Sequence, residues 1–285
     1  MNFSSLDSSK LKFIECVCDL CGNKESQVIY SVYFLGLKFC FVRCCVCGLV
    51  YQSPVLDKES LKNIYETLEY WEHKGSANST MLNYYSYFEE EDMRRRTADI
   101  RINWMAPYLP KGARVLDLGC SDGLFVDVLA KSGYRASGID VSSAMVSYGR
   151  KIYSVNIFRA DFEEDWPFTE PFDAISCYAT LSNIVNPSRV FANVHKHLRP
   201  GGYFFFNFGS YDRLISRFLR SRLYLYRPTV CTIYSKKTVT DYCHNHNLKI
   251  LKIFNDLQVV PLARLLGFFV FRVVLVYLSV LGLRK

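Results

Sequence analysis

Between residues 111 and 256 the chain alternates short apolar runs with segments in which apolar residues recur at helical spacing. The first run is Val115, Leu116 and Leu118, and the helical repeat that follows includes Leu124 and Val128. A short apolar run predicts a buried strand, and a repeat of three or four residues predicts an amphipathic helix. A second strand is predicted to end at residue 140, and later strands span 155–158, 172–177, 203–208 and 248–254. The predicted helices are 143–153, 189–198 and 238–245. Strands that alternate with helices predict an α/β fold with helices on both faces of one sheet.

The pattern before residue 111 is different. Residues 28–34 and 37–42 are rich in β-branched and aromatic side chains and predict two strands of a small β module. Helices are predicted at 58–70 and 84–104, on either side of the polar stretch 73–83. We therefore divide the chain into the small module (1–56), a helical linker (57–110), the α/β domain (111–256) and a C-terminal tail (257–285).

The tail is apolar from residue 262 to residue 283 apart from Arg264 and Arg272. It is long enough to cross a bilayer, but a central arginine costs about 2.5–3.5 kcal/mol on insertion scales. Two helical forms remain, one lying in the plane of a membrane surface and one buried in the protein. A third option is that residues 268–277 form a seventh, antiparallel strand, because Val and Phe suit strands. We favour a helix.

The net charge of +8 is concentrated near the C-terminus, because residues 213–285 hold 13 of the 35 Lys and Arg but only 2 of the 27 Asp and Glu. Residues 210–226 predict an arginine-rich amphipathic helix, which suits a membrane surface, an anionic acceptor or a plain exposed position. The N-terminus lacks the basic and apolar segments of a signal peptide. Eleven cysteines in such a chain favour thiols and metal over disulfides, so we expect a cytoplasmic protein.

Four cysteines form two C-x-x-C pairs, Cys18 with Cys21 and Cys44 with Cys47, each followed by glycine. This spacing is typical of a zinc ribbon, in which four thiolates hold one Zn²⁺ and leave no open position for catalysis. We predict a structural zinc ion, with buried cysteines that bind no metal as the alternative. Residues 1–60 carry six basic and six acidic residues, a balance that disfavours nucleic acid as a ligand. The cysteines left over are Cys16, Cys40 and Cys45.

A glycine turn, Gly119-Cys120-Ser121-Asp122-Gly123, follows the first predicted strand, and Asp140 lies 23 residues after Asp117. Such a turn lets the backbone approach a ligand, and a carboxylate at the tip of the second strand can accept both ribose hydroxyls of an adenosine. The turn lacks the middle glycine of a dinucleotide fingerprint, and its two acids, Asp117 and Asp122, would repel a pyrophosphate. Two carboxylates suit the amine and sulfonium of S-adenosylmethionine. An ordinary strand–helix turn in another α/β domain is the alternative.

Residues 115–123 resemble the first motif of class I S-adenosylmethionine-dependent methyltransferases, V-L-D-x-G-C-x-x-G, with Ser121 where that family usually has glycine. Residues 171–177 resemble the family's fourth motif. The resemblance implies a Rossmann-like sheet with S-adenosylmethionine as cofactor, the ribose at Asp140 and the adenine at Asp161 and Phe162. The cofactor-binding residues that it implies are Asp117, Gly119, Cys120, Gly123, Asp140, Val141, Asp161, Phe162 and Cys177.

In this family the end of the fourth strand lies where acceptor and cofactor meet, so we expect Tyr178 and Asn183 to take part in catalysis. Relatives commonly have Glu and His at 182 and 183, and that histidine can act as a base. Here Ser182 and Asn183 replace them, and asparagine cannot take a proton. The resemblance therefore supplies no general base. The helix before the first strand often covers the cofactor, although we favour a packed surface helix here. Its tyrosines that could approach the methyl donor are Tyr84, Tyr85 and Tyr87.

With its cysteine module, the chain is similar to sugar C-methyltransferases and to methyltransferases of surface-polysaccharide clusters. The similarity implies a small-molecule or glycan acceptor, including a lipid-linked one, and a cytoplasmic enzyme that contacts the inner face of the membrane through its tail. An RNA base methyltransferase is one alternative, which the neutral module disfavours and the arginine-rich helix keeps open. A cofactor-binding protein that has lost catalysis is another, because histidines common among relatives are absent at 183 and in 228–235.

Overall fold

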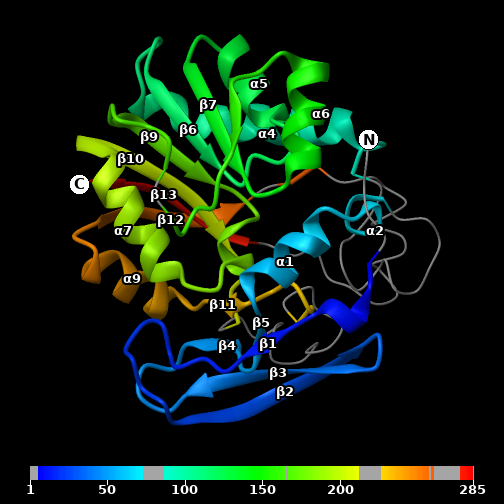
Figure 1. Ribbon diagram of the computed structural model, residues 1–285. Coiled ribbons are helices and arrows are strands. Elements are labelled where there is room, and N and C mark those ends of the chain that lie inside the picture. Colours follow the sequence, from blue (N-terminus) through cyan, green and yellow to red (C-terminus); the bar gives the residue numbers. More distant parts are fainter. Residues whose placement is uncertain are drawn as a thin grey trace.

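A seven-stranded sheet forms the centre of the computed structural model, which describes residues 6–72, 87–164, 166–211, 226–256, 258–259 and 277–284. The strand order is β12-β13-β10-β9-β6-β7-β8 (Figure 1). All neighbours pair in parallel except β13, which runs antiparallel to β10 and β12. The bounds are β6 (Arg114–Leu118), β7 (Arg135–Asp140), β8 (Ile157–Arg159), β9 (Phe172–Cys177), β10 (Leu198–Phe208), β12 (Lys249–Asp256) and β13 (Tyr277–Arg284). This sheet confirms the predicted α/β class.

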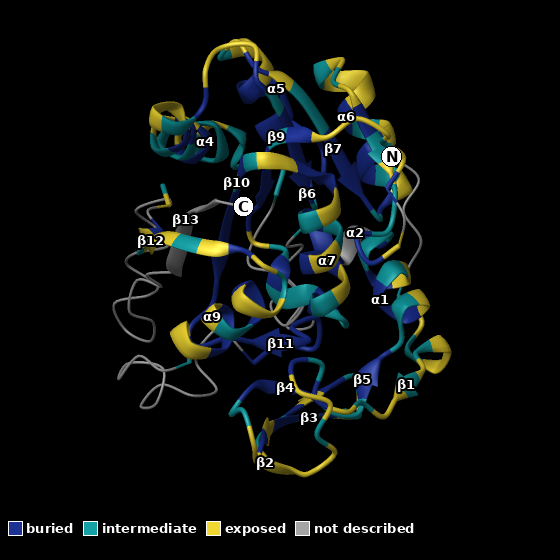
Figure 2. Ribbon diagram, turned by 90° about the vertical axis from the view of Figure 1, so that its left-hand side faces the viewer, coloured by how far each residue is buried: buried dark blue, intermediate teal, exposed yellow. Residues whose placement is uncertain are grey.

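Helices cover both faces of the sheet, as predicted. Helices α4 (Glu91–Met105) and α5 (Leu124–Lys131) pack on one face through a core that includes Ile102 and Leu129. Helices α7 (Pro187–His197) and α9 (Lys236–Asn245) pack on the other face around Phe191 and Tyr242. Helix α6 (Ser143–Tyr153) packs beside α5 and β8 through Val146. Figure 2 shows the central strands buried between helices whose outer faces are exposed.

The N-terminal residues form a second, smaller sheet, drawn in blue in Figure 1. Strands β2 (Ser26–Phe34), β3 (Leu37–Cys44) and β4 (Val50–Gln52) run antiparallel, which confirms the two strands predicted in this module. Strand β1 (Phe13–Ile14) pairs with β5 (Val55–Leu56). The fourth strand of the small sheet is β11 (Thr232–Ile233), which comes from the other end of the chain and pairs with β4. The module is therefore joined to the α/β domain by backbone pairing.

The linker contains two helices where one was predicted at 58–70. They are α1 (Lys58–Tyr65) and α2 (Leu68–Trp71). Between them, the carboxylate of Glu66 accepts hydrogen bonds from the backbone N–H groups of Ser143 and Ala144 at 2.6 and 3.1 Å. These are free donors in the first turn of α6, where a carboxylate is favourable. These hydrogen bonds to Glu66 hold the end of α1 against the residues that follow β7.

Where the structure describes the tail, it does not form the helix that we favoured. Strand β13 inserts between β10 and β12 and pairs with both. The alternative of a seventh antiparallel strand is right in kind, but the predicted range 268–277 shares only Tyr277 with the observed strand. Without β13, both neighbours would leave a row of backbone groups unpaired, and this requirement overrides the local preference for a helix.

Some expectations concern residues outside the described ranges. These are Tyr84 and Tyr85, most of the arginine-rich helix (212–225) and the first part of the tail (260–276). Three short 3₁₀ turns are described: η1 (Ser8–Lys10), η2 (Ala106–Tyr108) and η3 (Leu181–Asn183). Of the helices that the structure describes, none combines the length and apolar character needed to cross a membrane.

Candidate active site

A cavity of about 320 Å³ lies at the carboxyl ends of β6, β7 and β9. Because β7 and β9 lie on opposite sides of β6, the strand order reverses here, and open α/β sheets bind their ligands at such a point. Helix α4 and the segment 65–71 form the opposite wall. The predicted site residues that line the cavity are Asp117, Gly119, Cys120, Asp140, Val141, Phe162, Tyr178 and Asn183.

The backbone conformation of the turn and its close neighbours require glycine at both positions. Gly119 and Gly123 have positive φ angles of 71° and 75°. A Cβ atom at Gly119 would collide with Thr180, and one at Gly123 would lie 2.8 Å from a methyl carbon of Val155. Gly123 does not line the cavity, so its role is to allow close packing of the turn against Val155. Ser121 adopts the same left-handed region with a φ of 52°, which is why glycine suits this position in the family.

Asp140 lies at the tip of β7, as predicted, and its carboxylate is buried. One oxygen accepts the backbone N–H of Ser121 at 2.8 Å and the other that of Ser142 at 2.9 Å. Burial raises the pKa of Asp140 to about 6, while the two backbone hydrogen bonds oppose that shift. A carboxylate oxygen can accept more than one hydrogen bond. Asp140 can therefore still accept donors from a ligand on its cavity side.

Asp117 lies at the end of β6 and is also buried. It accepts a hydrogen bond from the Ser176 hydroxyl at 2.7 Å. Burial raises the pKa of Asp117 to about 7, while the Ser176 hydrogen bond and the positive charge of Arg101 lower it. Two carboxylates with raised pKa values on one cavity wall favour a ligand that brings positive charge.

Asp122 has an ion-pair partner that the sequence prediction missed. Arg94 donates to both of its carboxylate oxygens at 3.1 and 2.9 Å, and the Tyr87 hydroxyl donates at 3.2 Å. The Arg94 guanidinium also lies over the Tyr87 ring, 3.7 Å from its centroid. The charge of Asp122 is thus neutralised within the protein. This corrects our interpretation that it offers a free carboxylate to a cofactor amine.

Arg101 links the ends of β9 and β12. Its guanidinium lies 4.2 Å from the ring centroid of Tyr178 and 3.4 Å from Asp256. Asp256 accepts a hydrogen bond from the Asn207 amide at 2.7 Å, and the Asn207 oxygen accepts the Ala179 N–H at 2.6 Å. Ala179 has a φ of 57°, so this chain of contacts holds a strained backbone at the cavity. Burial raises the pKa of Tyr178 above its ordinary value, so its side chain stays a neutral phenol.

A second cavity, of about 310 Å³, adjoins the first and shares Val141 and Phe162 with it. Asp161 lines only this second cavity. Its carboxylate accepts the Glu163 backbone N–H at 2.9 Å and lies 3.6 Å from the ammonium of Lys58. The two cavities are therefore neighbouring compartments whose common wall residues include Val141, Phe162 and Asn183.

Cys177 is placed differently from the prediction. Its side chain is fully buried in the core on the α7 and α9 side and does not line either cavity. Tyr178 belongs to the core on the opposite side, because successive residues of a strand face opposite ways. Only one of the two adjacent residues can therefore reach a ligand.

The sequence of α4 contained an indication of the two arginines that the prediction missed. Arg94 and Arg101 are seven residues apart and occur on the helix face that also carries three buried apolar residues. Arginine on a buried face predicts a buried acidic partner. The sequence does not show which acids those partners are. The buried apolar residues of this face are Ala98, Ile102 and Met105.

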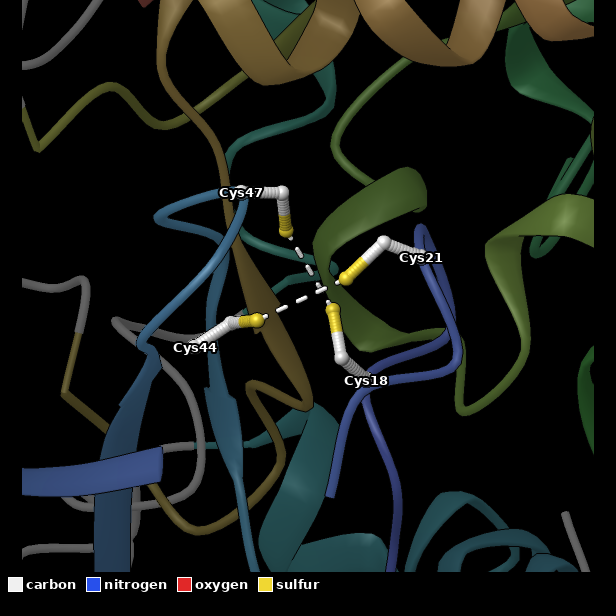
Figure 3. A group of neighbouring side chains, drawn as sticks. All are labelled: Cys18, Cys21, Cys44 and Cys47. Carbon is white, nitrogen blue, oxygen red and sulfur yellow. Dashed lines mark hydrogen bonds between the residues drawn. The ribbon is translucent and has the colours of Figure 1, made fainter. Parts of the chain in front are cut away.

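The four predicted cysteines converge at the edge of the small sheet (Figure 3). Their sulfur atoms all lie within 4.8 Å of one another, with 3.4 Å between Cys18 and Cys47 and 3.5 Å between Cys21 and Cys44. A tetrahedral Zn²⁺ with Zn–S bonds of about 2.3 Å places its sulfurs about 3.8 Å apart. The arrangement fits that ion. Within the described part of the chain, the cysteines outside this cluster include Cys16, Cys40 and Cys45.

The first cysteine pair is tied to the helices of the large domain. Asp19 accepts hydrogen bonds from the backbone N–H and the hydroxyl of Ser188 at 2.9 and 2.8 Å, and from the Tyr242 hydroxyl at 2.9 Å. Ser188 lies in the first turn of α7, where backbone donors lack helical partners. The loop between Cys18 and Cys21 therefore contacts both α7 and α9.

Comparison with known proteins identifies the large domain. The family described as a methyltransferase domain matches residues 89–253, more than half of the chain. The chain belongs to this methyltransferase family. A curated relative, the ubiquinone biosynthesis O-methyltransferase of Thiobacillus denitrificans, is 30% identical over 115 residues, which cover 38% of this chain and 50% of the relative. The chain thus spans about half the length of the curated relatives it matches.

Solved structures of methyltransferases show the same fold. One is the methyltransferase in complex with the Haloferax volcanii Trm112 methyltransferase activator, with a TM-score of 0.53, 18% identity and coverage of 70% of this chain and 95% of that chain. Another is the magnesium protoporphyrin IX methyltransferase of Synechocystis with bound S-adenosylhomocysteine, with a TM-score of 0.51, 16% identity and coverage of 70% and 88%. The predicted methyltransferase class, its fold and its cofactor S-adenosylmethionine are confirmed. The similarity to sugar C-methyltransferases stays a prediction.

Proposed function

We propose that this methyltransferase transfers the methyl group of S-adenosylmethionine to a small-molecule acceptor. The carrying observation is that Asp117, Gly119 and Asp140, which match the family's motif, line one cavity at the reversal of strand order. The cavity is closed on its other side by α4 and by aromatic residues of the segment 65–71. A cavity of this size suits a cofactor with a small acceptor better than it suits a nucleic-acid duplex.

The donor end is proposed to bind the cofactor as follows. Asp140 accepts the ribose hydroxyls with the lone pairs that its backbone contacts leave free. Val141 and Phe162 flank the adenine, and Asp161 lies at its edge in the second cavity. Asp117 attracts the positively charged methionine end. Two further residues, Gly119 and Cys120, provide close backbone approach. When bound, S-adenosylmethionine supplies an electrophilic methyl group.

At the acceptor end, Tyr178 and Asn183 are proposed to orient the nucleophile. The neutral Tyr178 phenol can donate a hydrogen bond, and the Asn183 amide can both donate and accept. Neither group takes a proton at neutral pH, so the acceptor proton leaves to water as the methyl–oxygen bond forms and the methyl–sulfur bond breaks. Alignment of the methyl donor with the acceptor can supply about 7–11 kcal/mol of the barrier reduction in such a site.

An oxygen nucleophile is the acceptor atom that the relatives favour, because the curated protein compared above is named an O-methyltransferase. We propose a hydroxyl of a small molecule or glycan intermediate, including a lipid-linked one. The basic, apolar C-terminal quarter supports peripheral contact with the inner face of the membrane by a cytoplasmic enzyme. This part of the proposal rests on composition and resemblance.

We also propose that Cys18, Cys21, Cys44 and Cys47 hold one structural Zn²⁺. The sulfur separations fit a tetrahedral ion, and four thiolates leave no coordination position for a substrate. Such an ion would fix the turn between β3 and β4 and the loop that carries Asp19.

The test is methyl transfer from cofactor that carries a radiolabelled methyl group. Purified protein and an extract of the source cells are incubated with it, and the products are separated into RNA, solvent-extracted lipid and soluble small molecules. The proposal predicts label in the lipid or small-molecule fraction. It also predicts loss of that label in Asp140→Asn and full label in Glu170→Gln, a surface control.

Other outcomes would contradict the proposal in distinct ways. Label that nuclease releases would show an RNA methyltransferase instead. A protein that binds S-adenosylhomocysteine but labels no fraction would be a cofactor-binding protein without catalysis.

A further inference from the structure

Gln52, the last residue of β4, is buried to 1% exposure and contacts a loop from a distant part of the chain. Its side-chain nitrogen lies 2.9, 3.1 and 2.7 Å from the carbonyl oxygens of Arg227, Pro228 and Val230. Its backbone N–H donates to the Cys231 carbonyl at 2.8 Å. A single glutamine thus contacts four of the five carbonyls in residues 227–231, which we call the clamp loop.

The segment that begins with the clamp loop also contacts the turn η3. The Cys231 N–H donates to the Ser182 carbonyl at 2.8 Å, and the Cys231 thiol lies 3.5 Å from the Asn183 carbonyl oxygen. Three residues further on, the Tyr234 hydroxyl donates to the Leu181 carbonyl at 3.1 Å. All three backbone carbonyls of η3 therefore receive a hydrogen bond from this one segment.

The turn η3 matters because it carries Asn183 to the wall of both cavities. Its position is thus fixed by β11 and the clamp loop, which β4 and Gln52 hold in turn. A buried amide is costly unless its hydrogen bonds are made. The side-chain oxygen of Gln52 has no hydrogen-bond partner among the described residues. The side chain of Gln52 therefore stabilises this region through its amide N–H groups, which donate to the clamp loop, and not through its oxygen.

We propose that Gln52 is a positioning residue that sets the acceptor wall of the cavity through the clamp loop and η3. The inference rests on the proposed function, because it takes Asn183 to lie beside the acceptor. It gives the N-terminal module a role beyond its own folding. Strand β4 of that module shapes the acceptor compartment, whereas the donor turn 119–123 takes no part in this chain of hydrogen bonds.

Hydrogen exchange measured by mass spectrometry tests the inference without an acceptor. Gln52→Leu removes the amide donors at similar volume, and Gln27→Leu, on an exposed position of β2 in the same module, is the matched control. In Gln52→Leu we expect the amides of Cys231 and Asn183 to exchange at least tenfold faster. Zinc content and the Kd for S-adenosylhomocysteine should stay close to wild type, the Kd within twofold.

Tyr234→Phe tests a different hydrogen bond to η3. This variant deletes only the hydroxyl that donates to Leu181 and leaves the N-terminal module untouched. Faster exchange in residues 181–183 is expected, and this test holds even if Gln52→Leu fails to fold. In the labelling assay, both variants should raise the half-saturating amount of extract at least fivefold, while that of S-adenosylmethionine changes less than twofold.

Two results would overturn the inference. One is faster exchange in the clamp loop of Gln52→Leu with unchanged exchange in 181–183. The other is loss of protection and of zinc throughout the module, which would show a purely structural role. Failure of the proposed function looks different, because a protein that exchanges as expected but labels no acceptor would keep the link from Gln52 to η3 and lose only the methyl-transfer assignment.

Discussion

The donor half and the acceptor half of the cavity are assembled in different ways. The donor half comes mainly from one continuous stretch: the end of β6, the turn 119–123 and the end of β7 with Val141. The acceptor half combines η3 with Arg101 of α4, Asp256 of β12 and a loop held by the N-terminal module. A site built from one stretch can be recognised as a motif, whereas a site built from distant pieces cannot.

The largest expected effect breaks the buried ion pair that joins the donor half to α4. Arg94→Met leaves the fully buried Asp122 carboxylate without its partner, which should lower the free energy of unfolding by about 3–5 kcal/mol. Urea unfolding measures this loss. The double variant Arg94→Met/Asp122→Asn should recover most of it, and Arg96→Met, at an exposed position, should change stability by less than about 0.5 kcal/mol. If the double variant is no more stable than Arg94→Met, the buried pair does not hold α4 on the turn.

A smaller effect concerns the carboxylate at the tip of β7. Asp140→Ala should weaken S-adenosylhomocysteine binding about 100-fold, because two hydrogen bonds to a charged group contribute about 1.5 kcal/mol each at the lower end of their usual range. Isothermal titration calorimetry measures the Kd. Glu170→Gln serves as a control with unchanged affinity. Wild-type affinity in Asp140→Ala would place the ribose elsewhere.

The smallest effect is a pH dependence of the donor half. Burial raises the pKa of Asp117 to about 7 and that of Asp140 to about 6, from an ordinary value of 3.8. Between about pH 4 and 7 the folded protein without ligand binds more protons than the unfolded chain, so its stability falls as pH rises through this window. A cationic ligand binds more tightly when these carboxylates are ionised. Affinity for S-adenosylmethionine should therefore rise about tenfold from pH 5.5 to 8, and less for S-adenosylhomocysteine, which lacks the sulfonium charge. Asp117→Asn should flatten the rise, and a flat profile in wild type would contradict it.

The same division explains what the sequence could predict. The motif 115–123 and the spacing to Asp140 are local, so the fold class and the donor wall follow from the sequence. The cysteine pairs are local as well, and their convergence was expected. The pairing of Arg94 with Asp122 and the contact of Gln52 with the clamp loop join residues far apart in the chain. Nothing in either segment alone names its partner.

The tail shows a further limit of local patterns. Residues 277–284 are apolar enough for a helix, but the two flanking strands leave a position in the sheet that only a strand can satisfy. Cys177 and Tyr178 give a similar example, since both were predicted as site residues but the alternation of side chains lets only Tyr178 face the cavity. Which strands pair, and which way each side chain points, depend on the assembled sheet.

The most direct test of this comparison removes the proposed zinc ion and measures both halves on the same sample. Protein stripped with a chelator and protein reloaded with Zn²⁺ are compared for S-adenosylhomocysteine affinity and for label transfer to the cell extract. We predict that the Kd stays within about threefold while label transfer falls at least tenfold and returns on reloading. Loss of both together, or of neither, would contradict the claim that the acceptor half depends on the N-terminal module and the donor half does not.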